Sequence, residues 1–424
     1  MKKIEEILKE DRIKEAKRSF QKAYFTYIIN REKAMKDVKV EELKKELRKI
    51  KEYSIDNIEN LKREAIKNLE RNGIKVYEAK KAKDAVRIFK KIVKKRERIV
   101  KSKSNVIHEI GLIEKIENRN EVIETDCGDF LVQICNEKPS HPVTPALHIP
   151  IEKMVSIIEK RFKVKLKPNA KEIAKWVREY LREKIREADV GLTGANVISS
   201  DGSIFILENE GNISLVSRIP RKHVIITSID KIVPTIKDAI LICKASSIWG
   251  TGSSMPAYVN VISSPSKTAD IQKEIVYGMH GAEEVYLILL DNNRSEIAKS
   301  ELKEILYCIN CGACLYVCPV YRQIFDYYGF NYFGGRGVAL SSLIYGLKKG
   351  YENGLYYCTT CMACKEICPL SIDVPKLIRK VRALALKNDI TTESVRQMLE
   401  NIEVSGNPFG EEREGIIPDK LYCC

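Results

Sequence analysis

The chain has 424 residues, of which 44% are hydrophobic and 31% charged, and its formal net charge is +15. This length exceeds one ordinary core and predicts two or three domains. There is no apolar run of membrane-spanning length and no secretory signal at the N-terminus, so the sequence predicts a cytoplasmic protein without a membrane span.

The positive charge comes with a surface rich in lysine and glutamate, a composition typical of proteins from heat-adapted organisms. No basic motif interleaved with aromatic residues accompanies it, so we expect no nucleic-acid partner. An acidic protein or substrate attracted by the basic field is the alternative.

The first part of the chain is predicted to be helical. Apolar residues recur at helical spacing in residues 4–13 and in residues 40–72, where Asn72 and Gly73 end the second pattern. We therefore expect residues 1–73 to form a helical N-terminal arm with a solvated charged face.

Predicted strands and helices alternate over residues 74–293. The strand-like segments are 74–77, 122–125, 130–134, 203–208, 223–227 and 284–290, and the helix-like segments are 82–95, 151–162, 170–188 and 234–244. This alternation predicts an α/β domain with a mostly parallel sheet.

The pattern changes after residue 293. Residues 294–390 hold two cysteine runs and a basic helix at 374–388, and we expect them to form a separate, mostly helical domain. Residues 391–424 are predicted to be a linker or tail. Its last two residues, Cys423 and Cys424, are expected to be inert, with metal binding alongside a partner as the alternative.

Eight of the thirteen cysteines lie in two runs with the same spacing. The first run is Cys308, Cys311, Cys314 and Cys318 followed by Pro319, and the second is Cys358, Cys361, Cys364 and Cys368 followed by Pro369. Two-cluster bacterial ferredoxins have this C-x₂-C-x₂-C-x₃-C-P spacing. Disulfides are not expected in a reducing compartment, and structural zinc uses separated cysteine pairs. The sequence therefore predicts two [4Fe-4S] clusters.

Three thiolates spaced by two residues can wrap one face of a cubane from a single loop, whereas the fourth points toward the other cluster. We therefore assign Cys308, Cys311, Cys314 and Cys368 to cluster 1, and Cys358, Cys361, Cys364 and Cys318 to cluster 2. Arg322 and Lys365 are candidates to tune the reduction potentials. Residues 327–337 are expected to cover the clusters, with a docking loop as the alternative.

Four other residues are candidates for catalysis. His141 and His148 flank a proline-rich loop and are candidate general bases or ligands, with a structural role as the alternative. Glu208 and Glu210 follow a strand, where α/β folds place ligand sites, although a helix-capping turn also fits. Residues 250–254 are a weak candidate for an anion cradle. No G-x-G-x-x-G fingerprint occurs, so neither NAD nor flavin is predicted.

The chain resembles the lactate-utilisation iron–sulfur protein B family over roughly residues 100–380. The segments that carry the resemblance include ENEGN at 208–212, LLDN at 289–292, CGAC at 311–314 and CPVYR at 318–322. The resemblance implies a LUD domain, similar to the ribose-phosphate isomerase fold, preceded by helices and followed by a two-cluster ferredoxin module. It also implies that the protein functions in a complex that oxidises L-lactate.

The leading hypothesis is thus an electron-transfer subunit of a 2-hydroxyacid oxidoreductase, rather than its catalytic subunit. Residues 405–410 look like the linker before a CCG-type cysteine domain, so we expect a separate cysteine-rich subunit among its redox partners. The alternatives are an adapter of heterodisulfide-reductase type, and a LUD-domain enzyme acting on a small phosphorylated or carboxylated substrate with the clusters as a relay. A basic nucleic-acid binder with structural clusters is the fourth hypothesis.

Overall fold

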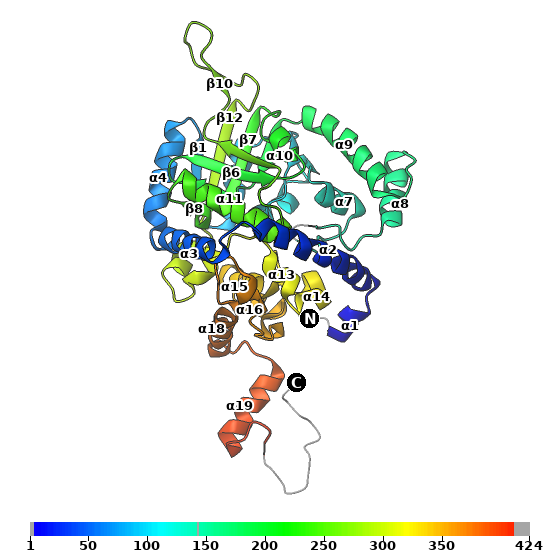
Figure 1. Ribbon diagram of the computed structural model, residues 1–424, viewed down its shortest axis with the longest axis vertical. Coiled ribbons are helices and arrows are strands. Elements are labelled where there is room, and N and C mark those ends of the chain that lie inside the picture. The colour runs from blue at the N-terminus through cyan, green and yellow to red at the C-terminus, as the bar shows by residue number, and fades with distance from the viewer. Residues whose placement is uncertain (1–3, 142–143, 411–424) are drawn as a thin grey trace.

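A computed structural model describes residues 4–141 and 144–410 of the chain. A sheet flanked by helices forms the α/β domain, and a helical module that carries both cysteine runs lies against one end of it (Figure 1). Within the described residues, no helix combines the length and the apolar character needed to cross a membrane.

The main sheet has six strands, and every pairing in it is parallel. In spatial order the strands are β1 (Lys75–Ala79), β12 (Glu284–Leu290), β7 (Lys222–Ser228), β4 (Val190–Thr193), β2 (Arg98–Lys101) and β3 (Glu121–Glu124). The prediction of an α/β domain with a mostly parallel sheet is therefore confirmed.

Helices cover both faces of this sheet. The helices of the α/β domain are α4 (Ile58–Arg71), α5 (Ala82–Ile92), α6 (Asn105–Glu109), α7 (Cys127–Cys135), α8 (Ile151–Phe162), α9 (Ala170–Arg186), α10 (Asn212–Val216) and α11 (Ile236–Thr251). Because strand side chains alternate between faces, Tyr286 and Ile288 of β12 join the core under α5 and α6, whereas Leu287 and Leu289 join the core that contains α4 and α11. Burial on both faces explains why β12 is almost entirely apolar.

One local prediction in this domain is wrong, and one sheet was not predicted. Residues 130–134 form part of α7 rather than a strand, because Asp126 caps the helix by accepting a hydrogen bond from the Asp129 amide and the apolar run is buried inside the domain. A second sheet, mostly antiparallel, was also not expected. It consists of β8 (Ile232–Val233), β5 (Val197–Ser199), β6 (Ser203–Glu208) and β9 (Tyr258–Ile262), and a hairpin of β10 (Lys267–Thr268) and β11 (Val276–Tyr277) projects beyond it.

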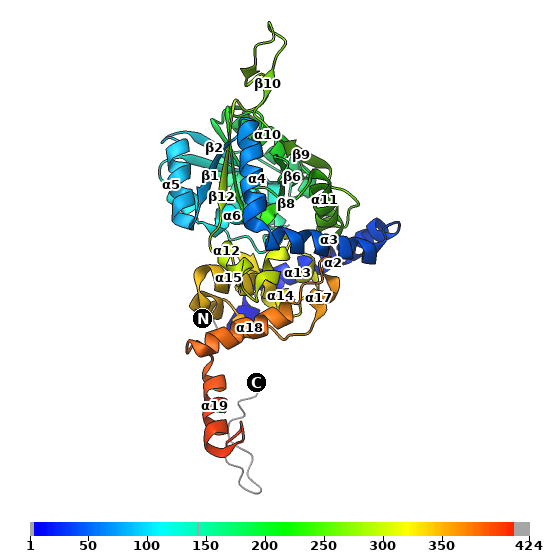
Figure 2. The same ribbon diagram turned by 90° about the vertical axis from the view of Figure 1, so that its left-hand side faces the viewer.

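The N-terminal residues are helical as predicted, but they do not form a free arm. The helices are α1 (Ile4–Lys9), α2 (Asp11–Met35), α3 (Val40–Asp56) and α4, and the predicted single helix over 40–72 is broken at Asn57. Figures 1 and 2 show α2 and α3 running along the junction between the α/β domain and the module. The Tyr27 hydroxyl donates to the Trp249 carbonyl at 2.7 Å, and Arg48 donates to the Leu370 carbonyl at 3.0 Å. These helices therefore clamp the two parts together.

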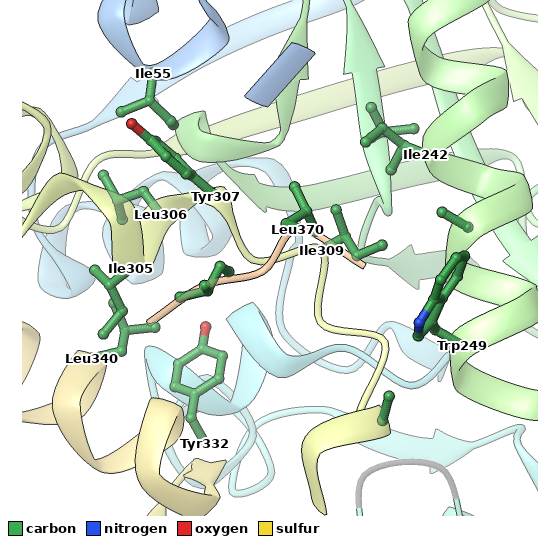
Figure 3. Packing of buried hydrophobic residues seen from close by; sticks show 14 of the residues in the cluster. Ile55, Ile242, Trp249, Ile305, Leu306, Tyr307, Ile309, Tyr332, Leu340 and Leu370 are labelled. Carbon is green, nitrogen blue, oxygen red and sulfur yellow. The ribbon is translucent and has the colours of Figure 1, made fainter. Parts of the chain in front are cut away.

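The module consists of short helices around the cysteine runs. They are α12 (Arg294–Ala298), α13 (Ala313–Val317), α14 (Tyr321–Ile324), α15 (Gly334–Tyr345), α16 (Leu347–Glu352), α17 (Ala363–Ile367) and α18 (Val374–Lys387), with the small hairpin β13 (Gly329–Phe330) and β14 (Tyr332–Phe333). Its apolar residues share one core with the α/β domain, where Tyr307, Ile309 and Leu370 lie between Ile55 and Trp249 (Figure 3). The predicted boundary at residue 293 is therefore crossed by a continuous core.

The predicted tail over 391–424 contains a helix, α19 (Glu393–Ser405), which buries no residue and extends away from the module (Figure 1). Cys423 and Cys424 lie outside the described residues.

Candidate cluster-binding site

The two cysteine runs have nearly the same backbone conformation. A 3₁₀ helix precedes each run, and the first cysteine is extended in both, with φ −60° at Cys308 and −63° at Cys358. The residue after the second cysteine is left-handed in both runs, with φ 79° at Gly312 and 69° at Met362. The residue before the second cysteine is left-handed as well, with φ 57° at Asn310 and 53° at Thr360. The internal repeat of the sequence is thus a repeat of structure, with each third cysteine on a short helix, α13 or α17.

The structure gathers the eight thiols into two groups. Electrostatic contacts place Cys308, Cys311 and Cys314 with Cys368, and Cys358, Cys361 and Cys364 with Cys318. Burial, followed by the charges of neighbouring thiolates in the same group, raises the pKa of Cys364 to about 12. Cys314 has Cys364 as well as Cys368 among its neighbours, so the groups lie side by side. This is the grouping that the crossed assignment requires.

Backbone N–H groups point at the sulfur atoms. The Asn310 amide donates to Cys308 Sγ at 3.3 Å, and the Tyr321 amide donates to Cys318 Sγ at 3.4 Å. Such hydrogen bonds favour the thiolate form, which is the form that binds iron. The backbone of these loops therefore stabilises thiolate sulfur.

The second group adjoins a cavity whose walls suit an anionic cluster. Cys318, Cys358, Cys361 and Cys364 line this cavity together with Tyr328 and Arg336. Arg336 Nε is buried and has no hydrogen-bond partner among the described residues, and the buried Tyr328 hydroxyl has no partner there other than the Cys358 thiol. Buried donors normally have a partner, and sulfur atoms of a cluster would supply one here.

The number of thiols in each group suits a cubane. In the described part of the chain, no group of three or more His, Cys, Asp or Glu side chains is arranged to hold one metal ion. In a cubane each of four thiolates binds a different iron, so two groups of four thiols match the ligands of two [4Fe-4S] clusters.

A buried group of charges lies against the first run. Arg294 Nε donates to Asp230 Oδ1 at 2.6 Å, and Lys51 Nζ donates to the Asp230 carbonyl at 2.5 Å. Lys231 Nζ lies 3.5 Å from Asp230 Oδ2 and donates to the Cys308 carbonyl at 3.3 Å. Three cations therefore surround one aspartate beside Cys308. Burial lowers the pKa of Lys51 to about 8 although Asp230 opposes that shift.

A cavity of about 330 Å³ separates the ends of several strands from the first cysteine run. Lys103 follows β2, Asp126 follows β3 and Glu210 follows β6, and all three line the cavity opposite Cys311. Lys103 Nζ lies 3.2 Å from Asp126 Oδ1, and burial followed by the charge of Asp126 raises the pKa of Glu210. Lys103 and Asp126 follow strands of the parallel sheet, and the carboxyl ends of parallel strands are where α/β folds bind ligands.

Glu208 and Glu210 have different surroundings. Glu208 is buried, and its carboxylate accepts hydrogen bonds from the Ile213 amide at 2.6 Å and from Asn260 Nδ2 at 2.7 Å. It caps α10, as the capping alternative supposed, so its candidate role in catalysis is not supported. Glu210 accepts from the Cys127 amide at 3.0 Å and faces the cavity, and of the four catalytic candidates it is the best placed.

The two histidine candidates lie in the core. His141 packs against the rings of Phe20, Tyr316 and Tyr321 with centroid distances of 5.9, 5.4 and 6.1 Å, and burial lowers its pKa to about 3. His148 Nδ1 lies 2.9 Å from Ser140 Oγ and burial lowers its pKa as well. These contacts are those of structural histidines, and His141 packs the α/β domain against the module.

Three weaker candidates also have structural roles. Gly250 belongs to α11, and a Cβ atom there would lie 3.0 Å from the Cys311 carbonyl oxygen, so glycine serves close packing rather than an anion cradle. Arg322 stacks over the Tyr24 ring at 4.8 Å. Lys365 Nζ pairs with Asp373 Oδ2 at 2.7 Å near the surface, which offsets its charge.

Comparisons with known proteins agree with this architecture. The family model described as the LUD domain matches residues 62–290, and the model described as the 4Fe-4S dicluster domain matches residues 304–372. The chain belongs to the LUD domain family. Its LUD region is joined to a 4Fe-4S dicluster domain, so the resemblance seen in the sequence is confirmed, and the match begins within α4, ahead of the predicted boundary at 74.

Similar curated proteins are named for lactate utilisation. Lactate utilization protein B 1 of Bacillus mycoides (strain KBAB4) is 36% identical over 307 residues, which cover 70% of this chain and 61% of that protein. Lactate utilization protein B of Bacillus subtilis (strain 168) is 33% identical over 303 residues, covering 70% of this chain and 62% of that protein. The chain thus spans about three fifths of the length of these relatives. A solved DUF162 family protein from Deinococcus radiodurans covers 55% of this chain and 98% of its own, at 14% identity and a TM-score of 0.30.

Sequence reasoning missed the charges beside the first run. Lys51 lies four residues after Leu47 and four before Ile55, so it stands on the buried stripe of α3, and that position was a signal. Asp230 and Arg294 carried no such local signal, since they meet only through the tertiary fold.

Proposed function

We propose that this chain is an iron–sulfur electron-transfer subunit of an oxidoreductase complex that oxidises L-lactate or a related 2-hydroxyacid. The observation that carries the proposal is the pair of adjacent four-thiol groups, which border each other at Cys314 and Cys364. Two [4Fe-4S] clusters held by Cys308, Cys311, Cys314 and Cys368, and by Cys358, Cys361, Cys364 and Cys318, would exchange one electron each.

The similar proteins named for lactate utilisation support the choice of substrate class. We also propose that the chain works with its redox partners in the cytoplasm. Because the clusters take single electrons, a partner must perform the two-electron oxidation of the hydroxyacid, and we infer that a cysteine-rich CCG-type subunit is among the redox partners.

The test is reduction of the clusters by substrate. Tagged protein is isolated without oxygen, once alone and once with its co-purifying chains, and L-lactate is added while the reduced clusters are followed by EPR. We expect reduction only with the partner chains present. Reduction by dithionite but never by L-lactate or another 2-hydroxyacid would reject the substrate class and favour an adapter of heterodisulfide-reductase type.

One observation favours a second candidate, an enzyme whose α/β domain acts on a small carboxylated or phosphorylated substrate with the clusters as a relay. The strand-end cavity reaches the first cysteine run, with Glu210 and Lys103 on one side and Cys311 on the other. Under this alternative the isolated chain would turn over its substrate, and Glu210→Gln would abolish turnover while the iron content stays unchanged. Glu117→Gln, on an exposed surface of the same domain, is the control.

A further inference from the structure

Arg336 is a buried cation without a carboxylate partner. Its residue is 8% exposed, Nε has no hydrogen-bond partner, and no ion pair joins it to an acidic side chain within residues 4–141 and 144–410. Its guanidinium carbon lies 5.3 Å from the centroid of the Tyr332 ring, which fixes its position. Lys51 is also close enough to feel its charge. Burying such a charge is costly unless an anion compensates it.

A glycine-rich turn at the start of α15 places Arg336 beside the second cysteine group. Arg336 lies in the first turn of α15, between Gly335 and Gly337. A Cβ at Gly335 would lie 3.2 Å from the Tyr328 hydroxyl and 3.7 Å from Cys358 Sγ, and one at Gly337 would overlap the Tyr332 backbone. Larger residues would push the helix away from the cysteines, so the glycines bring the arginine to the cavity wall.

Tyr328 is a second donor on the same wall. Its hydroxyl is buried without a partner oxygen or nitrogen, and its pKa is raised by burial, then by the charges of Cys358 and Cys318 and by a hydrogen bond to the Cys358 thiol. Tyr328 and Arg336 thus line the same cavity as the four thiols of the second group, and Cys314 of the first group borders this cavity as well.

We propose that Arg336, assisted by the Tyr328 hydroxyl, donates to the sulfur atoms of the second cluster and raises its reduction potential. This inference rests on the proposed function, because it requires a cluster at Cys318, Cys358, Cys361 and Cys364. A four-thiolate cubane becomes more anionic on reduction. A buried cation and a hydrogen-bond donor stabilise the reduced state more than the oxidised state. Arg336 thereby replaces Arg322 and Lys365 as the residue that tunes the potential.

The experiment is an EPR-monitored redox titration of the full chain under argon, with iron and acid-labile sulfide counted on every sample. The variants are Arg336→Met, Arg336→Lys and Tyr328→Phe. Lys365→Met is the matched control, since Lys365 lies within the second run but is offset by Asp373 at the surface.

In Arg336→Met we expect one of two midpoint potentials to fall. At a fixed poise its reduced-to-oxidised ratio drops about tenfold, a change of about 59 mV for a one-electron couple. Arg336→Lys should recover part of this loss, Tyr328→Phe should shift the same potential by less, and Lys365→Met should shift neither.

Full iron content with both potentials unchanged in Arg336→Met would overturn the inference and leave Arg336 as a packing residue on Tyr332. If Arg336→Met fails to fold, unchanged potentials in both Arg336→Lys and Tyr328→Phe would overturn it equally. A wild-type chain that binds no clusters would instead reject the proposed function itself.

Discussion

The first and second cysteine runs carry the same ligand spacing on the same backbone turns, yet they lie in different surroundings. The first run faces the α/β domain, where it meets the strand-end cavity, α11 and the buried charges around Asp230. The second run lies on the outer side of the module, where Cys361 is exposed. The comparison teaches that ligand spacing fixes the loop, whereas the rest of the fold decides what each cluster can exchange electrons with.

We expect the largest effect from a substitution in the buried group of charges beside the first cysteine run. In Asp230→Asn, Arg294 and Lys231 lose this carboxylate, although Arg294 keeps its pair with Glu109, and removing one partner of a buried ion pair typically costs about 3–5 kcal/mol. We expect a loss of this size in the free energy of unfolding, measured by denaturant titration without oxygen.

The control for this change lies beside the second run. Asp373 pairs with Lys365 near the surface, so Asp373→Asn should cost no more than about 1 kcal/mol. Equal losses in the two variants would show that the inner and outer surroundings do not differ as described.

We expect low pH to lower the free energy of unfolding through His141. Burial, and then the charge of Lys103, lowers its pKa to about 3, whereas the unfolded chain titrates near about 6.5. Below that value the unfolded chain takes up a proton that the folded chain refuses, so stability falls as the pH drops from about 6.5 toward 3, by about 1.4 kcal/mol per pH unit.

Unfolding free energies at about pH 7 and about pH 5.5 test this linkage. His141→Phe should remove one proton from the pH dependence, although it also changes the packing. Substituting the exposed His280 by Asn should leave the dependence as it is. A His141→Phe slope equal to that of the wild type would contradict the neutral, buried assignment.

The smallest expected effect sharpens the likeness of the two loops. Met362 has φ 69° where the first run has Gly312, and a side chain in the left-handed region costs about 1–2 kcal/mol. Met362→Gly should therefore stabilise the cluster-bound protein by up to about 1 kcal/mol after the entropy cost of glycine. Met362→Ala keeps the Cβ and should give no gain. A loss in Met362→Gly would mean that the methionine side chain itself is needed.

Local patterns predicted much of this architecture. The cysteine spacing predicted the cluster-binding module, which a 4Fe-4S dicluster model matches over residues 304–372, and the apolar run over 284–290 predicted the buried strand β12. The run over 130–134 misled because all of its residues except Gln133 are buried, and so short an apolar run has the same pattern in a helix as in a strand. The charges around Asp230 and the cavity beside Cys311 were beyond prediction, because they join residues that are distant in the chain and meet only when the sheet and the module pack.

The most direct test of the central claim is an iron and acid-labile sulfide count on protein purified without oxygen, followed by EPR after dithionite reduction. Two adjacent cubanes predict about eight irons per chain and a reduced signal broadened by coupling between neighbouring spins. Zinc in place of iron, or a single iron centre, would contradict the account.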